Sequence, residues 1–290
     1  MFCTVLAMTV LVPTTLDEAL AGIAANAGAT LLAGGTDLMV EVNEGHRRFP
    51  WPDDGTTVIA LNRIPELASW TYDPDANTLT LGAGVTWREI EDDPLRELVP
   101  ALAEAARTVG SPQIRHAGTV GGNLATCSPA GDGLPVLAAL DAAVGIVSSV
   151  GRRSMPVSEC MVGVKRTALQ PGELIETITL PLLDGWQGYS KVGVRNAMVI
   201  ATASACVATD LATRSVRVAL GSVGPTIIRC SDAEAFAIGV VDWETQSVAT
   251  HAAKEFGALA AAASRPIDDH RSTAAYRRRV RSICPGRSPA

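Results

Sequence analysis

The sequence has 290 residues, enough for two or three units that each bury an apolar core. Its 47% hydrophobic and 19% charged residues are typical of a globular protein and exclude extensive disorder. The formal net charge of -6 gives no electrostatic reason to expect a nucleic-acid partner. The one basic run, from Arg277 to Arg281, is typical of a solvated helix face or tail.

The first residues favour a strand over a membrane or secretion signal. The apolar run from Val5 to Val12 is too short to span a bilayer. No basic residue precedes it, and no clear cleavage site follows it. We therefore expect a cytoplasmic protein without a membrane span, and the sequence leaves both Met1 and Met8 open as the start of translation.

Thr14 or Thr15 is expected to cap the first helix, because a hydroxyl accepts hydrogen bonds from backbone N–H groups of the first turn. Apolar spacing predicts helices over residues 16–23, from 38 onward, and over 87–90, 98–109 and 134–140. It predicts strands over residues 30–33, 58–61, 79–83 and 143–147. The segment between Gly45 and Gly55 is predicted to be a loop or a seam between subdomains.

The pattern changes near residue 185. Strands are predicted over residues 189–194, 201–209 and 216–222, and two alanine-rich helices follow them. We therefore expect a separate C-terminal α+β domain that begins near residue 176.

The cysteines argue against a metal site in this chain. The six of them form no CxxC pair, and none clusters with the four histidines. This spacing disfavours zinc or an iron–sulfur cluster held by this chain alone. Disulfides are not needed in a reducing compartment.

Two glycine-rich segments carry the chemistry. Gly34-Gly35-Thr36 lies between a predicted strand and a predicted helix, where backbone N–H groups and a hydroxyl can bind a pyrophosphate. Such a turn alone is more often purely structural. The second segment again places a hydroxyl, at Thr119, beside the paired glycines Gly121 and Gly122 and an amide at Asn123. Neither segment has the G-x-G-x-x-G spacing of a Rossmann nucleotide site.

Together these segments resemble a known family. The residues are Leu32-Ala33-Gly34-Gly35-Thr36-Asp37-Leu38, the run from Arg115 to Ala125, and Ser128-Pro129-Ala130-Gly131-Asp132. They resemble the flavin subunit of the xanthine dehydrogenase and carbon monoxide dehydrogenase family of molybdenum hydroxylases. The likeness extends to Tyr189-Ser190-Lys191 and to the segment from Val218 to Arg229.

The resemblance implies an α+β fold. A two-subdomain FAD-binding domain of the PCMH or vanillyl-alcohol-oxidase-like type is expected over residues 1–175, with subdomains of about 1–55 and 56–175. A smaller α+β domain of the flavoprotein subunit is expected over residues 176–290.

The resemblance also implies the residues that bind FAD. They are Leu32, Ala33, Gly34, Gly35, Thr36, Asp37, Leu38, Thr119, Gly121, Gly122, Asn123, Asp132, Ile175 and Lys191. The first seven would surround the pyrophosphate, Asp132 would hold sugar hydroxyls, and Ile175 and Lys191 would reach the flavin ring. Three alternatives remain open: Asp132 as the N-cap of the following helix, Ile175 as a core residue, and Lys191 as a surface charge.

The implied function is electron transfer within a complex. Substrate would be oxidised at a molybdenum cofactor on a large subunit, and electrons would cross [2Fe-2S] clusters on a small subunit to FAD on this chain and then reach an external acceptor. A dimer of heterotrimers is expected. No residue of this chain would be catalytic, and His116 and Cys127 are expected to be structural rather than covalent attachment points.

Two other functions remain open at this stage. A self-sufficient FAD oxidase would need a large substrate domain, for which about 115 residues after position 175 leave little room. In a non-enzymatic partner-binding module, the glycine segments would be only turns. The sequence does not identify the substrate of the complex, or whether quinone, oxygen, NAD or a carrier protein accepts the electrons.

Overall fold

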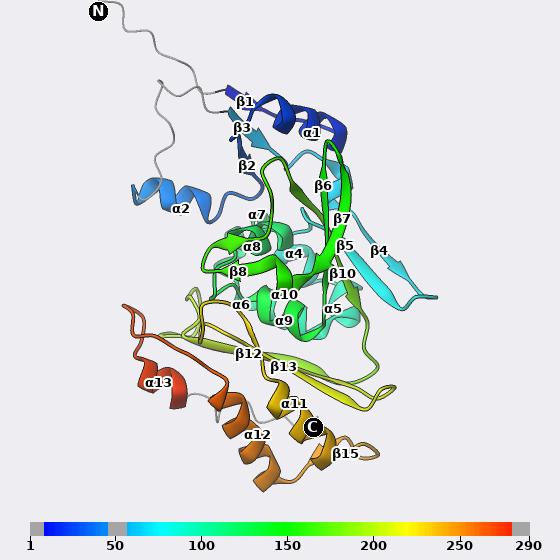
Figure 1. Cartoon of the computed structure of the whole chain (residues 1–290), viewed down its shortest axis with the longest axis vertical. Coiled ribbons are helices and arrows are strands. Elements are labelled where there is room, and N and C mark those ends of the chain that lie inside the picture. Colours follow the sequence, from blue (N-terminus) through cyan, green and yellow to red (C-terminus); the bar gives the residue numbers. More distant parts are fainter. Residues whose placement is uncertain (1–8, 46–56, 280–290) are drawn as a thin grey trace, which may run out of the picture.

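The computed structural model describes residues 9–45 and 57–279. The predicted loop or seam between Gly45 and Gly55 lies, apart from Gly45, outside the described residues. The three larger sheets of the described chain follow one another along its long axis (Figure 1). The mixture of helices and strands confirms the expected α+β class.

The N-terminal sheet is parallel and has the order β1-β3-β2. Its strands are β1 (Thr9–Leu11), β2 (Thr30–Leu32) and β3 (Thr57–Ala60). Helix α1 (Leu16–Ala25) buries one apolar face, as the spacing predicted. Thr15, rather than Thr14, caps this helix, because its hydroxyl accepts the N–H of Glu18 at 3.2 Å. A tight turn joins β2 to α2 (Leu38–Asn43).

The central sheet is antiparallel and has the order β4-β5-β10-β6-β7. Its strands are β4 (Trp70–Asp73), β5 (Thr78–Gly82), β6 (Ala143–Ser148), β7 (Gly151–Pro156) and β10 (Leu174–Pro181). Alternate residues such as Leu81, Val144 and Ile178 are fully buried, because side chains on a strand alternate between its two faces.

Short helices cover the buried face of this sheet. They are α4 (Trp87–Ile90), α5 (Leu95–Leu98), α6 (Pro100–Thr108), α7 (Pro112–Ala117), α8 (Val120–Thr126) and α9 (Gly133–Ala139). Small connecting elements complete this part of the chain: α3 (Pro65–Ala68), α10 (Val157–Cys160), β8 (Met161–Gly163) and β9 (Arg166–Thr167). The second glycine-rich segment therefore folds as two helices, α7 and α8.

The C-terminal sheet is antiparallel and has the order β11-β12-β13-β14. Its strands are β11 (Gln187–Val192), β12 (Ala203–Asp210), β13 (Ser215–Gly221) and β14 (Ile228–Arg229). One face contacts α6 and α9, and α11 (Ser231–Val240) and α12 (Thr250–Ala262) lie on the other side (Figure 1). The remaining elements are β15 (Val241–Asp242), β16 (Ser247–Val248) and α13 (Ala274–Arg279).

The two domains share one hydrophobic core, and the pairing of the strands indicates where the boundary between the domains lies. Tyr189 and Cys206 of the C-terminal sheet belong to the same buried cluster as Leu137 of α9. Strand β10 is the middle strand of the central sheet, so a boundary at residue 175 would fall inside it. We therefore propose a boundary within residues 182–186, and a first subdomain that includes β3.

The basic run follows the expectation of a solvated face only in part. Arg278 and Arg279 are exposed, but Arg277 is only 2% exposed. Its guanidinium bonds the carbonyl of Ser222 at 2.6 Å and the carboxylate of Asp269 at 2.6 Å. The arginine thus fastens α13 to the end of β13.

Candidate functional site

The first glycine turn leaves its backbone donors available. It runs from β2 to α2, and Gly35 has φ +69°, a left-handed conformation that favours glycine. The N–H groups of residues 34–37 make no hydrogen bond to any acceptor in the described part of the chain. Successive unpaired N–H groups in a tight turn form an anion-binding concavity.

The structure brings the two glycine-rich segments together. A Cβ built on Gly34 would overlap the carbonyl of Ala117 and would lie 3.0 Å from the Cα of Gly118. A Cβ built on Gly118 would lie 3.5 Å from the hydroxyl of Thr36. The turn after β2 and the junction of α7 with α8 are therefore in backbone contact, which only glycine at position 34 permits.

The second segment uses its donors differently from the sequence interpretation. Thr119 is the N-cap of α8, and its hydroxyl accepts the N–H of Gly122 at 3.0 Å. The N–H of Gly121 donates to the carbonyl of Ala83 at 2.9 Å. A Cβ on Gly121 would overlap Ala83. These two glycines therefore allow close packing, and their N–H groups are already bonded within the protein.

Asn123 has a side-chain oxygen without a partner. It lies in the first turn of α8, and its Oδ1 is buried and accepts no hydrogen bond within the described residues. A Cβ on Gly131 would lie 2.9 Å from Nδ2 of this amide, so the side chain extends toward the segment that precedes α9. A buried acceptor without a donor is costly, and its position indicates a ligand hydroxyl or N–H.

Asp132 and Lys191 form a buried ion pair between the two domains. The Lys191 ammonium lies 2.7 Å from Asp132 Oδ2, and the two side chains are 6% and 10% exposed. Tyr189 donates its hydroxyl to Asp132 Oδ1 at 2.8 Å, and Lys191 also donates to the carbonyl of Thr108 at 2.9 Å. Asp132 makes no side-chain cap bond to α9. The surface-charge alternative for Lys191 was therefore wrong. Asp132 does occupy the N-cap position of α9, but its carboxylate bonds Tyr189 and Lys191 and not the helix.

Burial dominates the electrostatics of this pair. It raises the pKa of Asp132, although the nearby ammonium of Lys191 and the hydroxyl of Tyr189 act in the opposite direction. Burial and the adjacent Asp132 hold the pKa of Tyr189 well above its ordinary value. Tyr189 therefore remains a neutral hydroxyl that can donate its hydrogen to the carboxylate.

Comparison with known proteins decides the family. Residues 6–183 match the model of the FAD binding domain in molybdopterin dehydrogenase, and residues 189–284 match that of the CO dehydrogenase flavoprotein C-terminal domain. The chain belongs to the FAD-binding subunits of the molybdenum hydroxylases. The predicted resemblance is confirmed, and the chain is a flavoprotein subunit of an oxidoreductase.

Individual relatives agree. The glyceraldehyde dehydrogenase medium chain of Sulfolobus acidocaldarius is 30% identical over 92% of this chain and 91% of its own length. The nicotinate dehydrogenase FAD-subunit of Eubacterium barkeri is 37% identical over 59% of this chain and 57% of its own length. Carbon monoxide dehydrogenase from Hydrogenophaga pseudoflava superimposes with a TM-score of 0.83 at 27% identity, over 97% of this chain and 95% of that one.

The residues present fit a flavin dinucleotide. The unpaired N–H groups of residues 34–37 suit a pyrophosphate, and the unpaired oxygen of Asn123 suits a ligand hydroxyl or N–H. The Asp132 carboxylate can accept further hydrogen bonds beyond the two that it receives. Gly34 contacts Ala117, six residues before Asn123, and a Cβ on Gly131, next to Asp132, would lie 2.9 Å from the Asn123 amide.

Three other residues that the sequence singled out have different surroundings. Ile175 is 3% exposed and belongs to the buried core cluster, so it is a core residue in this structure, as the alternative interpretation held. His116 is exposed, and its Nδ1 lies 2.7 Å from the carbonyl of Pro112. Cys127 is buried, and burial raises the pKa of its thiol. The thiol is therefore poorly suited to covalent attachment.

The sequence missed Tyr189 as a site residue. Tyr189 and Lys191 are two apart on β11, so both side chains lie on the face that meets Asp132. The sequence did contain a signal for it: a residue two positions before Lys191 on a predicted strand lies on the same face as Lys191. The backbone carbonyl of Thr108 had no sequence signal, because any residue supplies that group.

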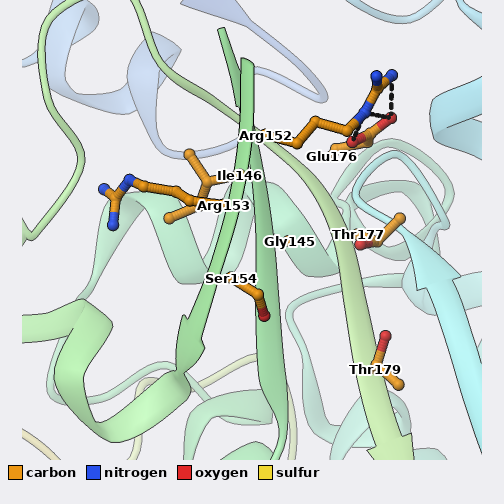
Figure 2. Close-up of a pocket in the computed structure, with 8 residues that line it drawn as sticks. All are labelled: Gly145, Ile146, Arg152, Arg153, Ser154, Glu176, Thr177 and Thr179. Atoms are coloured by element: carbon orange, nitrogen blue, oxygen red, sulfur yellow. Dashed lines mark hydrogen bonds and ion pairs between the residues drawn. The ribbon is translucent and has the colours of Figure 1, made fainter.

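A separate hollow of about 400 Å³ lies on the central sheet, lined by residues of β6, β7 and β10 (Figure 2). Figure 2 shows Arg152 and Arg153 extending to opposite sides, with Arg152 paired to Glu176. Glu173 neutralises Arg153 at 2.6 Å. With both cations paired, the hollow offers no unbalanced charge for a ligand.

The described ranges, 9–45 and 57–279, contain no helix long and apolar enough to cross a bilayer. Within the same ranges, no three His, Cys, Asp or Glu side chains gather closely enough to hold a metal ion.

Proposed function

We propose that this chain holds FAD between its two glycine-rich segments and the Asp132–Lys191 pair, receives electrons from iron–sulfur clusters of a partner subunit, and delivers them to an external acceptor. The contact between Gly34 and Ala117 carries this proposal, because it joins the unpaired N–H groups of the first turn to the segment that holds Asn123. Family membership supports the same assignment.

Each part of the site has a distinct role in this proposal. The N–H groups of residues 34–37 and the Thr36 hydroxyl bind the pyrophosphate, with residues 32, 33 and 38 around it. Thr119 holds the start of α8, and Asn123 accepts a hydrogen bond from the dinucleotide. Asp132 accepts sugar hydroxyls, and Lys191 donates toward the flavin ring. Ile175 shapes the adjoining core.

FAD supplies reversible storage of electrons, and the protein supplies binding, orientation and local charge. The medium chain and FAD-subunit named above are subunits of larger enzymes, which supports further subunits as partners of this chain. The partners that we propose are a large molybdenum subunit and a small iron–sulfur subunit, arranged as a dimer of heterotrimers. The proposed location is the cytoplasm.

The decisive measurement is the visible absorption spectrum of the purified chain, followed by denaturation and identification of the released chromophore. FAD at about one equivalent would support the proposal. A colourless chain that also fails to bind added FAD would contradict it. Purification of the chain with its native partners, with molybdenum and iron measured in the complex, tests the electron route.

The alternatives account for less of the structure. A self-sufficient oxidase would need a substrate domain, whereas the described residues after β10 form a sheet that shares its core with the flavin domain. A simple partner-binding module would not explain the buried Asn123 oxygen, which accepts no hydrogen bond within the described residues.

A further inference from the structure

Tyr189 links the two domains at the proposed flavin site. It lies on β11 of the C-terminal sheet and is 8% exposed. Its hydroxyl donates to Oδ1 of Asp132 at 2.8 Å, while the ammonium of Lys191 bonds the other oxygen, Oδ2, at 2.7 Å. The two carboxylate oxygens are thus each held by a different residue of the same strand.

The backbone around Tyr189 fixes the position of its hydroxyl. The N–H of Tyr189 donates to the Glu104 carboxylate on α6 at 2.7 Å. Tyr189 is opposite Cys206 in the register of β11 with β12, and its ring belongs to the shared core. Because the ring of Tyr189 is held in place, it cannot move with the Asp132 carboxylate. The hydroxyl of Tyr189 therefore fixes the orientation of the carboxylate.

Lys191 retains one donor for a ligand. An ammonium group has three N–H bonds. One is directed to Asp132 Oδ2 and one to the carbonyl of Thr108, at 2.7 and 2.9 Å. The third has no acceptor among the residues that the structure describes, although the side chain is only 6% exposed. A buried donor without an acceptor is costly, and its direction depends on how the other two are held.

We propose that Tyr189 is a positioning residue of the flavin site: its hydroxyl fixes the Asp132 carboxylate, and through it directs the third N–H of Lys191 toward a hydrogen-bond acceptor of the flavin ring. This inference rests on the proposed function. Tyr189 acts through Asp132 and Lys191 and does not itself contact the cofactor.

The test is Tyr189→Phe in the full chain, which removes the hydroxyl and keeps the ring in the core. The matched control is Tyr72→Phe, because Tyr72 lies on the edge strand β4 and is 42% exposed. FAD affinity is measured by quenching of flavin fluorescence. We expect Tyr189→Phe to weaken binding about tenfold, since the hydroxyl that orients the Asp132 carboxylate is lost. Tyr72→Phe is expected to bind FAD as the unchanged chain does.

A double-mutant cycle separates positioning from simple structural support. If Tyr189 acts through Asp132, then Tyr189→Phe has little further effect on FAD affinity in an Asp132→Asn background. The reduction potential of the bound flavin is the second readout. We expect it to become more positive in Tyr189→Phe, because the carboxylate that balances the Lys191 charge loses a stabilising donor. In the Asp132→Asn background this shift is expected to disappear.

The outcomes are distinguishable. If the unchanged chain does not bind FAD, the proposed function fails and this inference fails with it. If the unchanged chain binds FAD and Tyr189→Phe matches it in both affinity and potential, only the positioning role is overturned. Additive losses in the cycle would also overturn it, since they would show that Tyr189 acts independently of Asp132.

Discussion

Gly34 and Ala117 are in backbone contact, so that a Cβ on Gly34 would occupy the position of the Ala117 carbonyl. The two residues are 83 positions apart in the sequence and belong to different subdomains. Their contact places the unpaired N–H groups of residues 34–37 beside the start of α8. The flavin site is thus built at a junction that tolerates no side chain.

Gly34→Ala is therefore expected to separate the two segments. We expect loss of bound FAD and a free energy of unfolding lower by about 2 kcal/mol, since overpacking a tight contact costs about 1–3 kcal/mol. Flavin content after purification and denaturant unfolding measure the two effects. Gly239→Ala is the matched control, because a Cβ there meets nothing within 4 Å. It lies in α11, where alanine is favoured, so it should keep FAD and lose no stability.

Asn123→Ala is expected to change stability and binding differently. Its Oδ1 has no partner within the described residues, so the apo chain loses no hydrogen bond at that atom, and its unfolding free energy should stay within about 1 kcal/mol. The FAD dissociation constant should rise about tenfold. The control is Asn62→Ala, an exposed residue between β3 and α3. A large loss of apo stability with unchanged FAD affinity would show that Asn123 is structural.

How much of this could be read from the sequence depends on how local each feature is. The helix capped at Thr15 and the alternating strands follow from short-range patterns, and the structure confirms them. The glycine pairs also indicated a close backbone approach. The sequence could not show that the N–H of Gly121 is already bonded within the protein, because its acceptor, the carbonyl of Ala83, is 38 residues away.

The Asp132–Lys191 pair shows a second feature that the sequence could not reveal, which is burial. Each residue alone had a more ordinary interpretation, as a helix cap or as a surface charge, because burial is not visible in a sequence of one chain. The pairing depends on β11 packing against α6 and α9 from another domain. The same reason explains the wrong expectation for Arg277, whose burial depends on Asp269 and the end of β13.

His116→Ala is expected to leave flavin binding intact. The ring is exposed, and its Nδ1 already bonds the carbonyl of Pro112, so it is held as part of α7. We expect the variant to retain FAD at the level of the unchanged chain. In both proteins, acid precipitation should release all the flavin into the supernatant. Flavin that remains with the precipitated protein, and is lost in His116→Ala, would instead establish a covalent bond to this histidine.

Asp269→Asn is expected to loosen the C-terminal end of the chain. Asp269 bonds Arg277 at 2.6 Å and Arg271 at 2.8 Å, and Arg277 reaches the carbonyl of Ser222. The N–H of Ser222 in turn donates to the carbonyl of Pro129, three residues before Asp132. Leaving the buried Arg277 without its partner should cost about 3 kcal/mol of unfolding free energy at neutral pH.

Asp269 should also make the unfolding free energy of the chain depend on pH. Hydrogen bonds from Arg271 and from nearby backbone hold the pKa of Asp269 well below its ordinary value despite the opposing effect of burial, which is the largest single influence. A carboxyl with a lowered folded-state pKa stabilises the fold above its unfolded-state pKa of about 4, and that stabilisation is lost as the pH falls further. Unfolding free energies measured between pH 7 and pH 2 should therefore decline less steeply below pH 4 in Asp269→Asn than in the unchanged chain. Asp75→Asn, in the exposed turn between β4 and β5, should keep the full decline; equal declines in all three proteins would show that Asp269 does not stabilise the folded chain through its charge.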